Sequence, residues 1–180
     1  MKKLVLALLV IGCLSAGHGA QAQDGTVGYS ERVPDDAADK SVLYRRATDW
    51  VENHFAYVPK TIVRADAAKG EMRVEGTANV KTATVSGQLK ERQVRFEFVF
   101  HTLATGYDYS VGGFQLVLDP SKPNETMHFD EFVAQLAAER SNDRTHNDRR
   151  VTAQASSLAS EIAMSFRSFM NSRPAEGAVE

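Results

Sequence analysis

A stretch of strict two-residue alternation constrains the fold more than any other feature of this sequence. The apolar residues fall on even positions and are Val94, Phe96, Phe98 and Phe100. Arg95, Glu97 and His101 occupy odd positions of the same stretch. Successive side chains of a β-strand point to opposite faces, so this period is typical of a strand with one covered and one solvated face. We therefore predict a sheet whose Phe-bearing face is covered by the rest of the chain.

Weaker strand patterns surround this one, and short turn-rich connections separate most of them. They lie at Gly25–Val33, Thr61–Ala65, Met72–Val80 and Tyr107–Leu118. Short connections between consecutive strands require antiparallel pairing. In the last of these strands the apolar positions change from odd to even at Gly112–Gly113. A β-bulge produces such a change, so we predict one there.

Three segments show helical spacing instead. The first follows Pro34-Asp35-Asp36, which offers carboxylates to a helix start, and runs to about Phe55. The second is short and begins near Phe129; the third is a long apolar stripe from Val151 to Met170. The polar segment 141–148 between the last two is expected to be a mobile loop. Together the elements predict an α+β fold of two layers, a curved antiparallel sheet of about five strands with helices packed on one face.

The N-terminus has the pattern of a bacterial secretory signal. Lys2 and Lys3 precede an apolar run from Leu4 to Leu14, and Ala20-Gln21-Ala22 fits the A-x-A cleavage rule. The run is too short for a spanning helix, which needs about 20 residues. We expect residues 1–22 to be removed, 23–173 to form one domain, and the tail 174–180 to be disordered. The expected location is periplasmic or secreted.

A second interpretation of the N-terminus stays open. Val10-Ile11-Gly12-Cys13 resembles a lipobox, in which Cys13 would be lipidated and tether the protein to a membrane. Cys13 is the only cysteine, so cleavage after Ala22 leaves no thiol for disulfides, nucleophilic catalysis or metal binding. The net charge of −2 argues against general nucleic-acid binding. Membrane contact is expected only if Cys13 is lipidated.

The first helix also carries a family resemblance. Leu43-Tyr44-Arg45-Arg46-Ala47, followed by Trp50-Val51 and Phe55 and then a strand ending near Gly76, resembles a domain-of-unknown-function family of exported bacterial proteins with a TBP-like fold. The resemblance covers about residues 27–118. It implies a curved antiparallel sheet with helices on its convex side, and it implies no activity.

The residues that could serve catalysis or bind a metal or cofactor have ordinary structural explanations in this chain. His128-x-Asp130 and His146-x-Asp148 each offer two metal ligands, whereas a zinc site needs three or four. His54 is expected at the edge of the core, on the apolar face of the first helix. Glu125, Asp130 and Glu131 sit where a helix start favours acids. We therefore expect no enzyme activity, no metal and no cofactor.

The exposed face of the sheet is the candidate binding surface. Its proposed binding residues are Arg73, Arg95, Glu97 and His101, accompanied by Glu75 and Thr77 and by Tyr107 or Tyr109. The expected function is non-catalytic binding of an envelope protein or cell-wall component. One alternative is a carrier that holds a small apolar ligand between the sheet and the final helix; a weaker one is a hydrolase. The sequence does not specify the oligomeric state.

Overall fold

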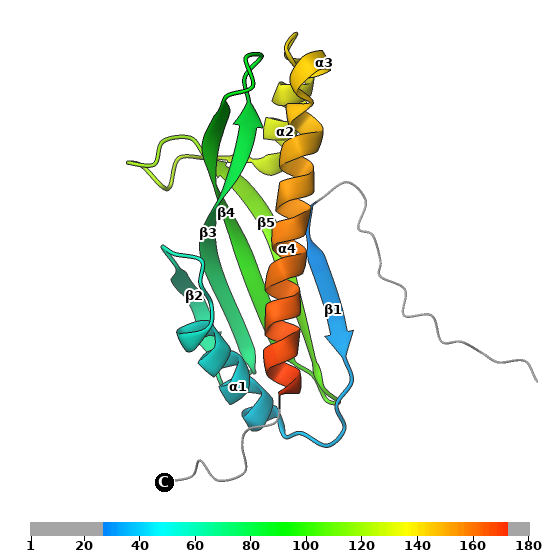
Figure 1. Ribbon diagram of the computed structural model, residues 1–180. Helices are drawn as coiled ribbons and strands as arrows, with labels where there is room; N and C mark the ends of the chain where they lie inside the picture. Colours follow the sequence, from blue (N-terminus) through cyan, green and yellow to red (C-terminus); the bar gives the residue numbers. More distant parts are fainter. Residues whose placement is uncertain (1–26, 173–180) are drawn as a thin grey trace, which may run out of the picture.

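The structure, a computed structural model, describes residues 27–172 (Figure 1). Its elements, in chain order, are β1 (Tyr29–Val33), α1 (Lys40–Asn53), β2 (Thr61–Asp66), β3 (Glu71–Ala83), β4 (Leu89–Thr102), β5 (Tyr107–Val117), β6 (Thr126–His128), α2 (Phe129–Ala138), α3 (Asn142–Thr145) and α4 (Asn147–Asn171). The expected signal segment 1–22 and tail 174–180 lie outside the described residues.

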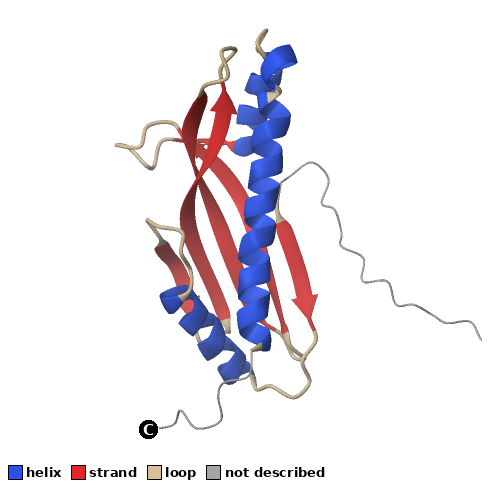
Figure 2. Cartoon of the chain, in the orientation of Figure 1, coloured by secondary structure: helices blue, strands red, loops and turns tan. Residues whose placement is uncertain are grey.

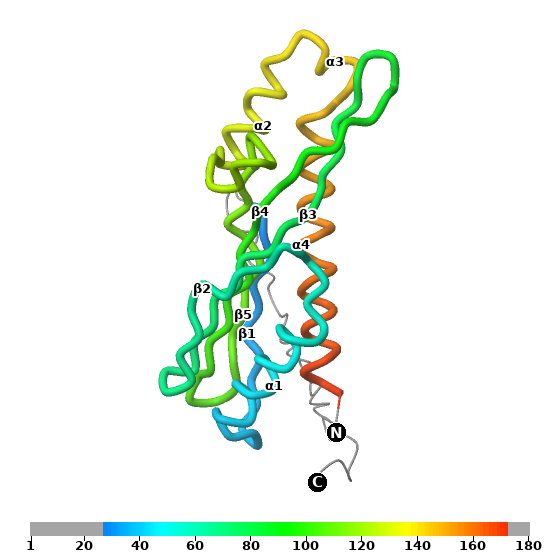
Figure 3. The backbone as a smooth tube through the Cα atoms, turned by 90° about the vertical axis from the view of Figure 1, so that its left-hand side faces the viewer, coloured from blue at the N-terminus to red at the C-terminus, as the bar shows by residue number. Residues whose placement is uncertain are grey.

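The strands form one antiparallel sheet in the order β1-β5-β4-β3-β2, and β6 pairs with the end of β5. Figure 2 shows α1 and α4 in front of the strands, and the side view in Figure 3 places both on the same side of the sheet. The predicted two-layer α+β fold with helices on one face is therefore confirmed. The sixth strand, β6, was not predicted because three residues are too few to show a period.

The register of the two central strands determines which side chains meet the helices. β3 and β4 pair without a shift from Glu71 opposite His101 to Ala83 opposite Leu89. Directly opposed residues of antiparallel strands project from the same face. The even positions of both strands therefore form one buried face, on which Phe96, Phe98 and Phe100 have no exposed surface. The odd positions form the opposite face, which we call the outer face.

The predicted β-bulge is present in β5. Arg95 and Glu97, two positions apart on β4, pair with Gln115 and Gly112, three positions apart on β5. Gly113 takes a φ of 61°, in the left-handed region that favours glycine. The extra residue returns Phe114 and Leu116 to the buried face after the change of parity.

Aromatic rings fill the space between the sheet and the helices. Trp50 of α1 is 1% exposed, and its ring centroid lies 5.0 Å from that of Phe98 and 5.0 Å from that of Phe166 on α4. Phe166 also packs against Tyr109 at 4.8 Å and has no exposed surface. These side chains pack together in the region between the sheet and α4, where the carrier hypothesis places a small apolar ligand.

Two expectations for the helix termini of α1 need correction. Asp35 accepts hydrogen bonds from the amides of Ala37 and Ala38, both at 3.1 Å, but these close a turn, and the regular helix begins only at Lys40. His54 follows the helix as its C-cap and is exposed rather than part of the core edge. Its ring still lies 4.7 Å from that of Phe169 on α4.

The expected mobile loop at 141–148 is instead α3 and the first turn of α4. Asn147 is only 5% exposed because its side chain bonds to the backbone of β3. Its amide oxygen accepts from the Ala83 N–H at 2.7 Å, and its amide nitrogen donates to the Ala83 carbonyl at 2.9 Å. These contacts span 64 positions of sequence, so local composition could not indicate them.

Candidate functional site

The outer face of the sheet carries all four predicted binding residues. Arg73 lies on β3, and Arg95, Glu97 and His101 lie on β4 at odd positions. The two strands are neighbours, so the register places Arg73 opposite Val99, and Glu97 opposite Glu75. Within residues 27–172, α1 and α4 pack on the other side of the sheet (Figure 3), and the start of α2 borders the outer face only beside Glu97.

The charges on the outer face are arranged as diagonal ion pairs between strands. Arg73 Nη2 lies 2.9 Å from Glu97 Oε2, and Arg95 Nη1 lies 3.7 Å from Glu75 Oε2. Arg95 also donates to Gln115 Oε1 of β5 at 2.7 Å. Partly exposed pairs of this kind contribute only about 0–1 kcal/mol each to stability. Their arrangement nevertheless presents both signs of charge in fixed positions.

The pattern continues to both sides of these pairs. His101 Nδ1 lies 2.8 Å from Asp108 Oδ1 of β5, and Arg64 of β2 pairs with Glu71 of β3 at 3.3 Å. His101 is therefore brought onto the same face as the other three predicted residues, but it is held by a different partner. Opposite charges on neighbouring strands form a continuous polar surface across β2, β3, β4 and β5.

Tyr107 and Tyr109 do not join this face. Both are 2% exposed, because the register places Tyr107 opposite Thr102 and Tyr109 opposite Phe100, on the buried face. Asp108 and Gln115 take the outer positions instead. The apolar residues of this strand occupy odd positions before the bulge and even positions after it. This pattern was sufficient to predict that both tyrosines lie on the buried face.

A small cavity opens where the outer face meets the bulge. β1 pairs with β5 as far as Val111, and β6 pairs with the same edge of β5 from Gln115 onward. The interval between these pairings holds a cavity of about 240 Å³. Its lining includes Val27, Glu97, Gly113, Gln115, His128 and Asp130. Glu97 thus belongs both to the ion-pair surface and to the cavity.

The residues weighed as metal ligands now have definite positions. His128 and Asp130 face the cavity at the start of α2, whereas His146 joins α3 to α4 with a φ of 49°. Within residues 27–172, no group of three or more His, Cys, Asp or Glu side chains is placed to hold a metal ion. In the same range, no helix is long and apolar enough to cross a membrane.

A second polar cluster lies on the buried side, between β1 and α4. Glu31 accepts hydrogen bonds from Tyr109 at 2.6 Å and from Tyr29 at 3.2 Å, and it pairs with Arg167. Burial raises the pKa of Glu31, but hydrogen bonds from Arg167 and Tyr109 and the Arg167 charge lower it by more, so it lies below its ordinary value. Burial and the bond to Glu31 raise the pKa of Tyr109. Three side chains thus donate to Glu31. Because Arg167 lies on α4, its pair with Glu31 connects β1 to the helical layer.

Comparison with known proteins gives a family and a fold. A family model described as a domain of unknown function (DUF4468) with TBP-like fold matches residues 29–116. The crystal structure of a DUF4468 family protein from Bacteroides ovatus matches with a TM-score of 0.60 at 14% identity, covering 86% of this chain and 91% of that one. A TBP-like protein from Parabacteroides distasonis matches with a TM-score of 0.56 at 13% identity, covering 86% and 99%. No curated protein matches the chain.

Proposed function

Residues 29–116 belong to the DUF4468 family of TBP-like domains, and from this premise we propose that the chain is an exported, non-catalytic binding module. Its partner contacts the outer face of the sheet. The observation that supports this proposal is the ordered array of cross-strand ion pairs, built on Arg73, Arg95 and Glu97, on a face that the helices leave open. Fixed charges of both signs favour specificity for a partner with the complementary pattern.

The size of the cavity favours a macromolecular partner. Its volume of about 240 Å³ lies below the range of about 300–1,000 Å³ usual for small-molecule sites. A cavity of this size suits one side chain or one sugar substituent of a larger partner. We therefore propose an envelope protein or a cell-wall component that covers the ion pairs and inserts one group beside Glu97.

Two alternatives have less support. The carrier function needs an apolar cavity under α4, where Trp50 and Phe166 pack against the sheet. The hydrolase function needs an acid, a base or a nucleophile free to act on a substrate. On the outer face, Glu97 is bound to Arg73, and His101 is bound to Asp108. This engagement in ion pairs supports a binding role over a catalytic one.

We propose a periplasmic or secreted location, because the N-terminus has the pattern of a bacterial secretory signal. Cleavage after Ala22 would release a chain beginning at Gln23, four residues before the first described residue, Val27. Lipidation of Cys13 is the second possibility, and it would tether the same domain to a membrane.

The proposal is tested by affinity capture with charge-reversed variants. Wild-type protein, the double variant Arg73→Glu/Arg95→Glu and the control Arg45→Glu are incubated with purified peptidoglycan and with a detergent extract of the envelope. Arg45 is exposed on α1, in the helical layer. We expect the double variant to lose at least about 90% of the captured component and the control to retain it. Thermal melts should show all three folded, because surface ion pairs contribute little to stability.

The same experiment contains the results that would contradict the proposal. Equal capture by the double variant and the wild type would exclude the outer face. Hydrolysis of an ester or glycan panel that His101→Ala abolishes would establish an enzyme instead. The intact mass of the natively expressed protein reports the N-terminus: a start at Gln23 is expected, and an uncleaved Met1 would exclude export.

A further inference from the structure

The hairpin between β3 and β4 projects beyond the sheet at the end where α3 and α4 meet (Figure 1). Two apolar side chains are exposed at this tip, Val85 by 59% and Leu89 by 57%. Isolated exposed apolar residues are common on protein surfaces. Two of them at one turn, at the end of the described part of the molecule, form a small apolar tip that residues 27–172 leave uncovered.

This turn is a fixed structure. The Thr84 N–H donates to the Gln88 carbonyl at 2.8 Å, and the Gly87 N–H donates to the Thr84 carbonyl at 2.9 Å. Gly87 takes a φ of 85°, which a residue with a side chain rarely adopts. Val85 and Leu89 therefore lie on a hydrogen-bonded turn, where each remains more than half exposed.

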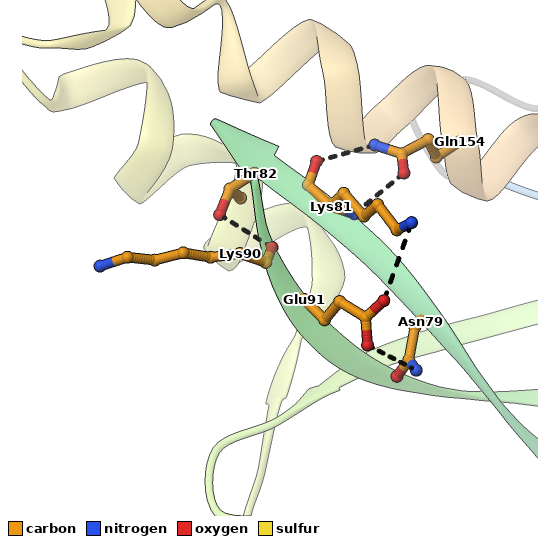
Figure 4. A network of polar contacts seen from close by, with 6 residues as sticks. All are labelled: Asn79, Lys81, Thr82, Lys90, Glu91 and Gln154. Carbon is orange, nitrogen blue, oxygen red and sulfur yellow. Dashed lines mark hydrogen bonds and ion pairs between the residues drawn. The ribbon is translucent and has the colours of Figure 1, made fainter. Parts of the chain in front are cut away.

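The hairpin is also attached to α4. Gln154 accepts from the Lys81 N–H and donates to the Lys81 carbonyl, both at 2.9 Å (Figure 4). Asn147 makes the same pair of bonds to Ala83, two residues further along β3. The two amide side chains occupy the place of a neighbouring strand. They hold the tip close to the cationic start of α4.

The two segments that meet at this end of the molecule carry a net positive charge. Residues 81–92 and 139–150 together contain seven Lys or Arg and four Asp or Glu, a net charge of +3 in a chain whose net charge is −2. Lys90, Arg144, Arg149 and Arg150 are all exposed. None of these four forms an ion pair with another residue of the range 27–172. Their charges are thus available to an anionic partner.

We propose that this hairpin-tip surface, consisting of Val85, Leu89, Lys90, Arg144, Arg149 and Arg150, docks on an anionic lipid bilayer. Apolar side chains next to a basic cluster suit the interface of such a bilayer. The apolar groups enter the headgroup boundary, while the cations contact lipid phosphates. An acidic protein would complement the cations, but it gives no reason for two apolar side chains on a fixed turn.

The docking does not depend on the binding role of the outer face, because the two surfaces share no residue. It also gives membrane contact without lipidation at Cys13. An apolar tip of only two side chains makes this contact weak and reversible, and the attraction of the cations should decrease with added salt.

Vesicle sedimentation of the full mature chain tests the proposal. The probes are vesicles of phosphatidylcholine alone and vesicles of phosphatidylcholine with phosphatidylglycerol. The variants are Val85→Ser/Leu89→Ser and Arg149→Glu/Arg150→Glu, with Val58→Ser and Arg45→Glu as controls. Val58 is 68% exposed and lies just before β2, so its substitution removes a comparable apolar side chain from a different surface.

We expect binding to the anionic vesicles only, with a partition coefficient reduced about tenfold or more in each tip variant and unchanged in both controls. Thermal melts verify that each variant is folded. Failure of the wild type to bind anionic vesicles would overturn the proposal. The proposal would also be overturned if Arg149→Glu/Arg150→Glu lost vesicle binding and Val85→Ser/Leu89→Ser did not. That result would show attraction by charge without insertion of the apolar side chains. Binding of soluble polyglutamate in preference to the vesicles would assign the tip to an acidic protein instead.

Discussion

At the scale of single residues, Glu31 shows what the sequence pattern can and cannot specify. Its odd position places it with Tyr29 and Val33, on the side of β1 that faces the helices. The pattern does not predict that Arg167, 136 positions later, would meet it there. A half-buried acid in this place gains from such partners, because partial loss of solvent favours the neutral form of an unpaired carboxyl.

The lowered pKa of Glu31 leads to a prediction about acid stability. The folded state favours the ionised carboxyl, so its contribution is fully present above the ordinary pKa of 4.5 and is lost as the pH falls through the lower pKa of the folded protein. Glu31→Gln should therefore be less stable than wild type at pH 7, and the difference should shrink as the pH falls below 4.5. Urea melts across this range measure it. The control is Glu52→Gln, at an exposed position on α1. A difference between wild type and Glu31→Gln that is independent of pH would contradict the assignment.

At the scale of elements, periodicity was sufficient for the long strands and helices. The alternation at 94–100 correctly predicted the buried Phe face of β4, and the parity change at Gly112–Gly113 correctly predicted the bulge. The segment 141–148 and strand β6 were missed for a physical reason. Both are short, and they are stabilised by contacts with distant backbone, as Asn147 is by Ala83. Polar composition alone indicates a loop in such cases.

The two bonds of Asn147 predict a local loss of stability on substitution. Asn147→Ala leaves the Ala83 N–H and carbonyl without their partner, and the expected cost is about 1–3 kcal/mol of the free energy of unfolding. Hydrogen exchange at the Ala83 amide should accelerate more than exchange in the centre of β3. Asn53→Ala provides the matched control, because the Asn53 side chain donates to Asp49 at an exposed position, and its loss should change stability by less than about 0.5 kcal/mol. Unchanged exchange at Ala83 would show that Asn147 does not hold the hairpin.

At the scale of the whole molecule, the fold class was predictable and the binding surface only partly so. Strand parity was enough to place Arg73, Arg95, Glu97 and His101 on one face. Their pairing with Glu75, Asp108 and Gln115 depends on the strand register, which the sequence pattern does not specify. The cavity beside Glu97 depends on where β1 and β6 end along the same edge of β5, and thus on tertiary structure alone.

The central claim is that the outer face contacts the partner, and the most direct test is position-specific photo-crosslinking in bacterial cells. A photoreactive residue replaces Val99, on the outer face between Arg73 and Ser110, or Met164, which is 65% exposed on α4 in the opposite layer. We predict one discrete adduct from position 99 that Arg73→Glu/Arg95→Glu abolishes, and no equivalent adduct from position 164. An adduct from position 164 together with none from position 99 would contradict the claim and assign binding to the helical layer.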